Sequence, residues 1–341
     1  MRNNANYGGR IMKKTLSVLI AAIMMTGCLS ACNAAKNADT AGKGNIQIVT
    51  TIFPEYDWVI NVLGDNPAGA EVTMLLDNGV DLHSYQPTAE DIMKISTCDM
   101  FIYVGGESDE WVEDALKEAT NKDMAVINLL EVLGENVKEE EVVEGMQEEE
   151  EEEHEGKGEE EEVEYDEHVW LSLRNVSVLT EYISKELQRI DAQNAEAYKK
   201  NSDEYVEKLN ALDKQYTEAI SNASVKTLLF GDRFPFRYLT DDYGLSYYAA
   251  FVGCSAETEA SFETIMFLAQ KVDELSLHAV MTIEGDNHKI AETIVQNTSS
   301  KDQKILTMDS MQSTTSKDVK EGTTYLSIME SNLSVLKEAL K

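Results

Sequence analysis

The chain has 341 residues, a formal net charge of -34 and four cysteines. This excess of carboxylates excludes nucleic acid as a partner, because binding to phosphates requires basic surface, and it favours the attraction of cations. Four cysteines are too few for a disulfide-stapled domain, and a mature chain of about 300 residues is long enough for two hydrophobic cores.

Residues 1–32 have the anatomy of an export signal. Two lysines precede an apolar run from Leu16 to Met25, which is shorter than the roughly 20 residues of a membrane-spanning helix. Residues 29–32 read Leu-Ser-Ala-Cys, the spacing of a bacterial lipobox, so we predict that Cys32 is lipidated. Cys28 is the second candidate, and an ordinary cleaved signal is the alternative. We expect a protein anchored by lipid on the extracytoplasmic face of the cell membrane.

A flexible tether over residues 33–45 is predicted to lead into an N-terminal α/β lobe over residues 46–172. Short β-branched and apolar runs predict its strands, at Ile46–Thr51, Glu71–Leu76, Met100–Val104 and Ala125–Leu129. Helical patterns lie between them, at Tyr56–Leu63, Thr88–Ser96 and Trp111–Ala119. Alternating strands and helices are typical of a parallel sheet.

An acidic tract interrupts this lobe over residues 139–164. It has no apolar periodicity and contains one histidine, His154. Such a charge run is predicted to be a disordered loop. One interpretation is a solvated run without a specific role, and the other is a loop that concentrates cations by electrostatic attraction.

Connecting helices are predicted over residues 173–222. Apolar side chains recur every three or four positions up to Ile190, which indicates a short helix, and a longer one follows from Ala192 to Ile220. A C-terminal α/β lobe is predicted over residues 223–341, with strands at 227–230, 247–251, 279–283 and 304–307. The predicted fold class is α/β, with two lobes carrying parallel sheets, a long helical backbone between them, and a cleft at their interface.

Two of the five histidines stand out by their surroundings. His83 lies in Asp-Leu-His-Ser-Tyr-Gln-Pro, and His168 lies in Asp-Glu-His-Val-Trp-Leu. Each follows a predicted loop and has carboxylates nearby. Taken singly, either histidine is as well explained by a capping or core role. Neutral imidazole is nevertheless a common zinc ligand, and neighbouring carboxylates orient such rings.

These two segments resemble the histidine motifs of the zinc- and manganese-type solute-binding lipoproteins of bacterial ABC importers, a family with adhesin-like members. Leu82 and Gln86 are mild departures from the first motif. The resemblance covers about residues 46–341. It implies that two lobes hold one divalent metal, with His83 and His168 as ligands, and that an importer permease and its ATPase are the partners. We expect the chain to be a monomer.

The third ligand of that family is where the sequence departs. Arg233 stands at or near its position, and a guanidinium cannot bind a cation. Asp232 is a candidate substitute, and Arg233 is predicted to pair with Glu257 or Glu259.

The resemblance implies a carboxylate as the fourth ligand, for which Asp309 and Glu284 are the candidates. His288 and His154 are further candidates. An ordinary role at a loop end is the alternative for each of these residues. The remaining cysteines, Cys98 and Cys254, are interpreted as small buried hydrophobic residues.

The predicted cargo is Zn2+, because imidazoles favour zinc, with Mn2+ as the alternative because carboxylates favour manganese. A surface adhesin or interaction protein without tight metal binding is the second hypothesis. A zinc hydrolase is the third, but the sequence shows no zincin helix, phosphate loop or nucleophile elbow. We therefore expect no enzymatic activity.

Overall fold

The computed structural model describes residues 45–147, 164–255, 259–285 and 287–341. The predicted lipidation sites Cys32 and Cys28, the tether up to residue 44, and His154 lie outside this part of the chain. No helix within the described ranges has the length and apolar character needed to cross a bilayer.

The first sheet has four strands, all parallel, in the order β2-β1-β3-β4. Its strands are β1 (Gln47–Thr50), β2 (Glu71–Met74), β3 (Met100–Tyr103) and β4 (Ala125–Asn128). They alternate with α2 (Phe53–Leu63), α3 (Ala89–Thr97), α4 (Trp111–Lys117) and α5 (Leu129–Leu133). Each of these four strands coincides with a predicted one, because helices cover the sheet and leave β-branched and apolar runs in the sequence.

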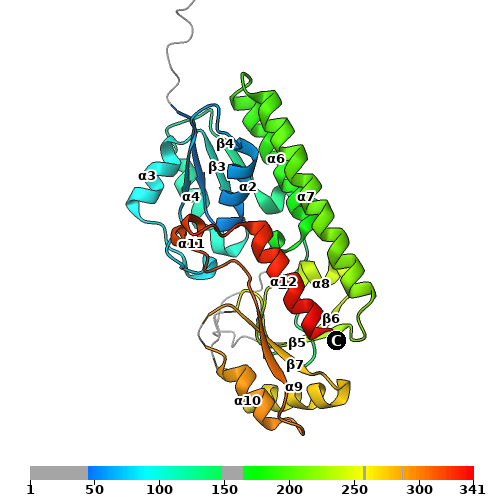
Figure 1. Ribbon diagram of the computed structural model, residues 1–341. Helices are drawn as coiled ribbons and strands as arrows, with labels where there is room; N and C mark the ends of the chain where they lie inside the picture. The colour runs from blue at the N-terminus through cyan, green and yellow to red at the C-terminus, as the bar shows by residue number, and fades with distance from the viewer. Residues whose placement is uncertain (1–44, 148–163, 256–258, 286) are drawn as a thin grey trace, which may run out of the picture. The chain divides into compact units, whose positions relative to one another are not determined.

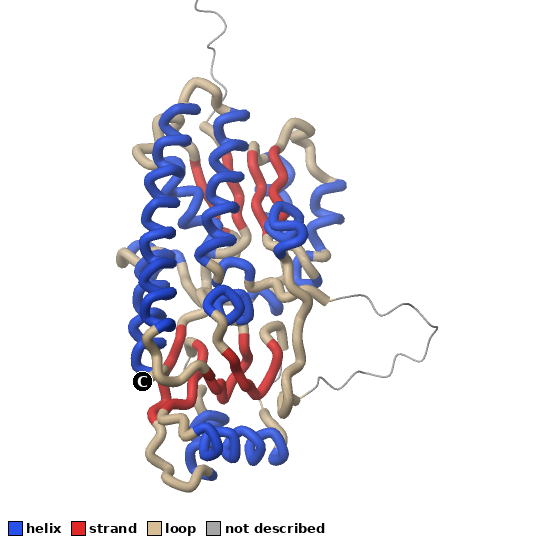
Figure 2. Tube along the Cα trace, turned by 90° about the vertical axis from the view of Figure 1, so that its right-hand side faces the viewer, coloured by secondary structure: helices blue, strands red, loops and turns tan. Residues whose placement is uncertain are grey.

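The second sheet repeats this architecture, with four parallel strands in the order β6-β5-β7-β8. Its strands are β5 (Thr227–Phe234), β6 (Ser246–Val252), β7 (Ala279–Ile283) and β8 (Lys304–Met308). The helices that follow β5 in the chain are α8 (Arg237–Tyr243), α9 (Phe262–Leu275), α10 (Lys289–Asn297), α11 (Ser316–Lys320) and α12 (Tyr325–Ala339). Figure 2 shows the strands gathered in two separate groups. The predicted fold class, two α/β lobes with parallel sheets, is confirmed.

Two long helices, α6 (Leu173–Ile190) and α7 (Ala195–Ser221), follow the first sheet and precede the second sheet in the chain. They pack side by side (Figure 1). The Ser172 side chain accepts a hydrogen bond from Asn175 N and so caps α6. This cap marks the start of α6 at Leu173, and the helix ends at Ile190, in agreement with the predicted connecting helices over residues 173–222. Val176, Leu179 and Leu187 are among the side chains that it buries.

The last helix, α12, belongs to both lobes. It contacts β7 and β8 of the second sheet, and it also contacts α2 and α7 (Figure 1). At its first turn, the ring of Tyr325 packs edge-on against Trp58 at 5.8 Å, and its hydroxyl donates to Trp170 O at 2.6 Å. One hydrophobic cluster consequently runs from the first sheet through α6, α7 and α12 into the second sheet. A smaller cluster lies under α9 and α10.

The contact between β5 and α10 depends on Gly231, and it gives a first testable prediction. A Cβ atom at this position would lie 2.6 Å from Ala291 Cα and 2.8 Å from Ala291 N. These are backbone atoms, so the helix itself must shift. We expect Gly231→Ala to lower the free energy of unfolding by about 1–3 kcal/mol, measured by urea denaturation. An unchanged midpoint would show that α10 moves aside without cost.

Candidate metal centre

The loop after β2 holds His83 in a 3₁₀ turn, Leu82–Ser84. Asp81 caps this turn by accepting a hydrogen bond from His83 N at 3.0 Å. The ring Nδ1 lies 2.8 Å from Ser108 Oγ and 3.5 Å from Glu167 Oε2. Ser108 belongs to the turn Glu107–Asp109, which follows β3. The ring of His83 is thus oriented through Nδ1, and Nε2 remains available for a ligand.

His168 lies directly before the 3₁₀ turn Val169–Leu171 and is fully buried. Asp166 Oδ1 accepts hydrogen bonds from His168 N at 2.9 Å and from its Nδ1 at 3.0 Å. A carboxylate on Nδ1 fixes the ring and the tautomer, as it does behind many metal-binding histidines. Nε2 of His168 therefore lies on the side of the ring that faces away from Asp166.

The two Nε2 atoms face each other at 3.3 Å, although the residues are 85 positions apart. Burial lowers the pKa of His83 to about 3, and the neighbouring His168 contributes to the shift. Burial acts to lower the pKa of His168 as well, but Asp166 and Glu167 outweigh it and hold that pKa above its usual value. Burial thus favours a neutral His83, whereas the two carboxylates favour the protonated form of His168.

Glu167 adds a second negative group at the pair. Its Oε1 accepts a hydrogen bond from Ser108 N at 2.9 Å, while its Oε2 is buried without a hydrogen-bond partner. The carboxylate approaches closely because Gly106, at φ 84°, has no side chain: a Cβ there would lie 2.4 Å from Glu167 Oε1. A buried, incompletely satisfied carboxylate beside two imidazoles makes the site attractive to a cation.

Cys254 lies beside the two histidines, and the sequence analysis did not identify it as a candidate ligand. One ligand atom each from His83, His168 and Cys254 lies within 4.8 Å of the others. Cys98 is buried as predicted, whereas Cys254 is partly exposed, so its interpretation as a buried hydrophobic residue was wrong. The available signal was its place directly after β6, because the carboxyl ends of parallel strands form binding sites.

Arg233 does not point to a ligand position. Its Nη2 donates to Asp81 Oδ2 at 2.7 Å, and its Nη1 donates to the Ser255 carbonyl at 3.3 Å. The carboxylate partner is therefore Asp81 rather than the predicted Glu259, and Glu257 lies outside the described residues. Arg233 outweighs the effect of burial and holds the pKa of Asp81 below its usual value. This ion pair connects β5 to the turn that carries His83.

The predicted carboxylate ligands are engaged in hydrogen bonds. Glu284 accepts from Ser310 N, Ser310 Oγ and Gln312 N. Asp309 Oδ1 accepts from Met311 N at 2.7 Å, and burial together with the charge of Glu284 raises the pKa of Asp309 to about 7. Both side chains thus shape the loop after β8.

Asp232 and His288 form no part of the three-residue group either. Asp232 accepts from two backbone amides, those of Arg233 and Ile283. His288 precedes α10, and its Nδ1 is buried without a hydrogen-bond partner. Within the described residues, the group of His83, His168 and Cys254 contains neither of these side chains, nor Glu284, nor Asp309.

The ends of the acidic tract pair with each other and with the second lobe. Glu139 and Tyr165 form an antiparallel bridge. Glu140 Oε1 accepts from Cys254 N at 3.2 Å, and Glu141 pairs with Arg237 at 2.8 Å. The described start of the tract therefore lies next to the candidate ligands.

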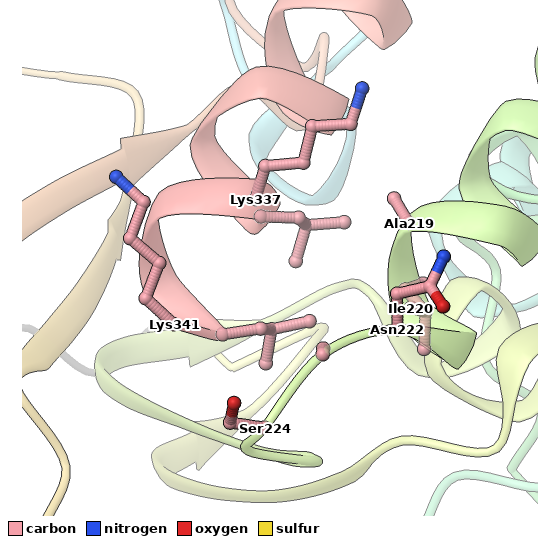
Figure 3. Close-up of a pocket in the computed structure, with 9 residues that line it drawn as sticks. Ala219, Ile220, Asn222, Ser224, Lys337 and Lys341 are labelled. Carbon is pink, nitrogen blue, oxygen red and sulfur yellow. The ribbon is translucent and has the colours of Figure 1, made fainter.

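A separate cavity of about 230 Å³ lies where α7 and α12 end (Figure 3). Small and aliphatic side chains line it together with Lys337 and Lys341. None of the predicted site residues contributes to it. The chemistry that a metal requires is thus found at the histidine pair and not in this cavity.

Two parallel sheets, with candidate ligands in the loops at the carboxyl ends of their strands, define a two-lobed solute-binding protein. The chain belongs to the family described as ZnuA, zinc-uptake complex component A periplasmic, whose model matches residues 48–339. The family resemblance found in the sequence is thereby confirmed.

Known relatives agree with this assignment. Zinc-binding lipoprotein AdcA of Streptococcus pneumoniae is 33% identical over 325 residues, which cover 95% of this chain and 61% of the relative. High-affinity zinc uptake system protein ZnuA of Bacillus subtilis is 29% identical, with 95% of this chain and 97% of the relative covered. The chain therefore spans less than two thirds of AdcA but nearly all of the second relative.

A solved structure supports the fold. The Zn(II)-bound ZnuA-like domain of Streptococcus pneumoniae AdcA matches with a TM-score of 0.67 and 29% identity, over 87% of this chain and 99% of that domain. The laminin-binding protein Lmb of Streptococcus agalactiae matches with a TM-score of 0.67 at 23% identity, which shows the shared fold alone.

Proposed function

We propose that this chain captures Zn2+ outside the cytoplasm and delivers it to an ABC importer. The observation that carries the proposal is the pair of Nε2 atoms at 3.3 Å. Zinc–nitrogen bonds of about 2.0–2.1 Å in a tetrahedral site place two nitrogen ligands about 3.3–3.4 Å apart. A zinc ion therefore fits between the Nε2 atoms of these two rings.

The orientation of the rings supports direct ligation by His83 and His168. Both Nδ1 atoms are occupied, by Ser108 and Asp166, so each ring presents Nε2. We propose a carboxylate of the second lobe as a further ligand. Asp309 would give up one hydrogen bond from Met311 N, whereas Glu284 would give up three, so Asp309 is the better candidate.

The relatives favour zinc over the alternatives. AdcA and ZnuA are named for zinc, and the solved AdcA domain holds Zn(II). Neither manganese nor loss of tight metal binding receives similar support. The chain spans 61% of AdcA, so Zn2+ as the cargo of this chain is a proposal.

We also propose where the protein is anchored and which partners it serves. Cys32 would carry the lipid that anchors the chain to the extracytoplasmic face of the membrane, consistent with the name lipoprotein of its relative. The permease and ATPase of a zinc importer would be its partners, and the chain would act as a monomer. We retain residues 46–172, 173–222 and 223–341 as its functional divisions.

Titration of the full chain with Zn2+ tests the function. We expect one tight site per chain by calorimetry in wild type, and a strong loss of affinity in His83→Ala. The matched control is His278→Ala, because His278 Nε2 contacts the Glu338 carbonyl at 3.0 Å, apart from the site. Equal zinc affinity in wild type and His83→Ala would overturn the proposal.

A further inference from the structure

We infer that Cys254 supplies a thiolate ligand to the zinc ion held by His83 and His168. The inference rests on the proposed function, since it names a further ligand at the same site. Cys254 would also supply the ligand that Arg233, which stands near the third ligand position of the family, cannot provide. A tetrahedral zinc ion accepts four ligands, and the two imidazoles fill only two of these positions.

The distances allow this assignment. Ligand atoms of Cys254 and the two histidines lie within 4.8 Å of one another. With a zinc–sulfur bond of about 2.3 Å, tetrahedral geometry places sulfur about 3.5 Å from each nitrogen. A displacement of Sγ by about 1 Å therefore completes the arrangement, which is within the reach of a side-chain rotation. The thiol loses its proton to solvent as the zinc–sulfur bond forms.

The backbone around Cys254 is fitted to the site. A Cβ on Gly253 would lie 2.9 Å from His168 Cε1 and 3.0 Å from its Nδ1. The absence of a side chain thus allows the backbone that leads from β6 into Cys254 to lie directly on the imidazole. Glu140 holds the Cys254 amide at 3.2 Å. This segment is therefore positioned by contacts on both sides.

A second observation shows that the surroundings favour a cation. Glu167 is 2% exposed, its Oε2 has no hydrogen-bond partner, and that atom lies 3.5 Å from His83 Nδ1. The negative charge of Glu167 would act on the metal through His83. Two imidazoles, a thiol and this carboxylate form a more specific environment than an isolated cysteine.

A thiolate would also set the selectivity of the site. Sulfur ligands favour zinc, whereas manganese prefers oxygen ligands. With Cys254 as a ligand, the protein would discriminate between these ions through the donor atom itself. A cysteine that is merely close to the histidines would leave the ratio of the two affinities unchanged.

Co2+ provides a direct test, since it occupies zinc sites and reports thiolate ligation by a charge-transfer absorption in the near ultraviolet. We would compare full-chain wild type with Cys254→Ser and with the matched control Cys98→Ser, whose native thiol is buried elsewhere. Cys28 and Cys32 are retained in all three proteins, and the absorption assigned to Cys254 is the difference between the spectra of wild type and Cys254→Ser. We expect the absorption in wild type and Cys98→Ser, and its loss in Cys254→Ser.

Affinity measurements give an independent readout. We expect Cys254→Ser to weaken Zn2+ binding at least 100-fold, above the 10–100-fold cost of removing a residue that only orients a ligand. The ratio of Zn2+ to Mn2+ affinity should fall in Cys254→Ser and fall further in Cys254→Asp. Melting of the metal-free variants checks that they remain folded.

The outcomes separate the two proposals. Zinc binding that depends on His83, without thiolate absorption in wild type, would overturn the role of Cys254 and leave the proposed function intact. Retention of the absorption in Cys254→Ser would also overturn that role. Absence of tight zinc binding in wild type would instead contradict the proposed function.

Discussion

Changing His168 to alanine should remove tight zinc binding, with a larger effect than any other single substitution that leaves the fold intact. Zinc sites with four ligands contribute about 10–16 kcal/mol, so one ligand accounts for about 3–4 kcal/mol, or roughly 100–1,000-fold in affinity. Competition with a zinc chelator measures this loss. His168 is fully buried, so water does not readily replace its nitrogen.

A graded series makes this prediction specific. Asp166→Asn keeps His168 but weakens the contact between Oδ1 and Nδ1, which is 3.0 Å long in the native protein. We expect about a 10–100-fold loss, because Asp166 orients the ligand without touching the metal. Equal losses in Asp166→Asn and His168→Ala would mean that the carboxylate, rather than the imidazole, binds zinc.

Changing Trp170 to alanine should produce the largest loss of stability among these substitutions. The side chain is 1% exposed and its Nε1 donates to the Ser310 carbonyl at 2.8 Å. Removing a buried tryptophan costs about 3–5 kcal/mol through lost contacts and the remaining cavity. Urea denaturation should show this decrease in the free energy of unfolding.

Trp170→Phe separates packing from hydrogen bonding. Phenylalanine restores most of the buried surface but leaves the Ser310 carbonyl without its donor, for which we expect a cost of about 1–3 kcal/mol. If alanine and phenylalanine were equally destabilising, the hydrogen bond would account for the effect. If neither changed the midpoint, Trp170 would not connect the first lobe to the loop after β8.

The eight strands were predictable because each contains β-branched or apolar residues that pack under helices, although β5 continues to Phe234 beyond the predicted end at Phe230. The helix α6 was predictable as well, because its apolar side chains recur every three or four positions up to Ile190 and Ser172 caps its start. The position of α12 was beyond sequence reasoning. Its contacts with α2 arise from tertiary packing that no local pattern encodes.

The residues of the site likewise divide into those that a local sequence pattern predicts and those that depend on tertiary contacts. His83 and His168 were recognisable because each lies in a distinctive segment, and the structure brings them together as predicted. Cys254 was missed because its neighbours in space, His83 and His168, come from the first lobe, and no local pattern in the sequence encodes that tertiary contact. The partner of Arg233 was wrong for the same reason, since Asp81 comes from the other lobe.

The shared core has a consequence for how the chain acquires its structure. The 15 residues of α12 follow both sheets in the chain, yet Tyr325 completes the packing around Trp58 and donates a hydrogen bond to the carbonyl of Trp170. A nascent chain that lacks this helix therefore leaves the first lobe with an open apolar face. We infer that the first lobe reaches its final packing only after α12 has been synthesised, so that this lobe stays incompletely folded until then.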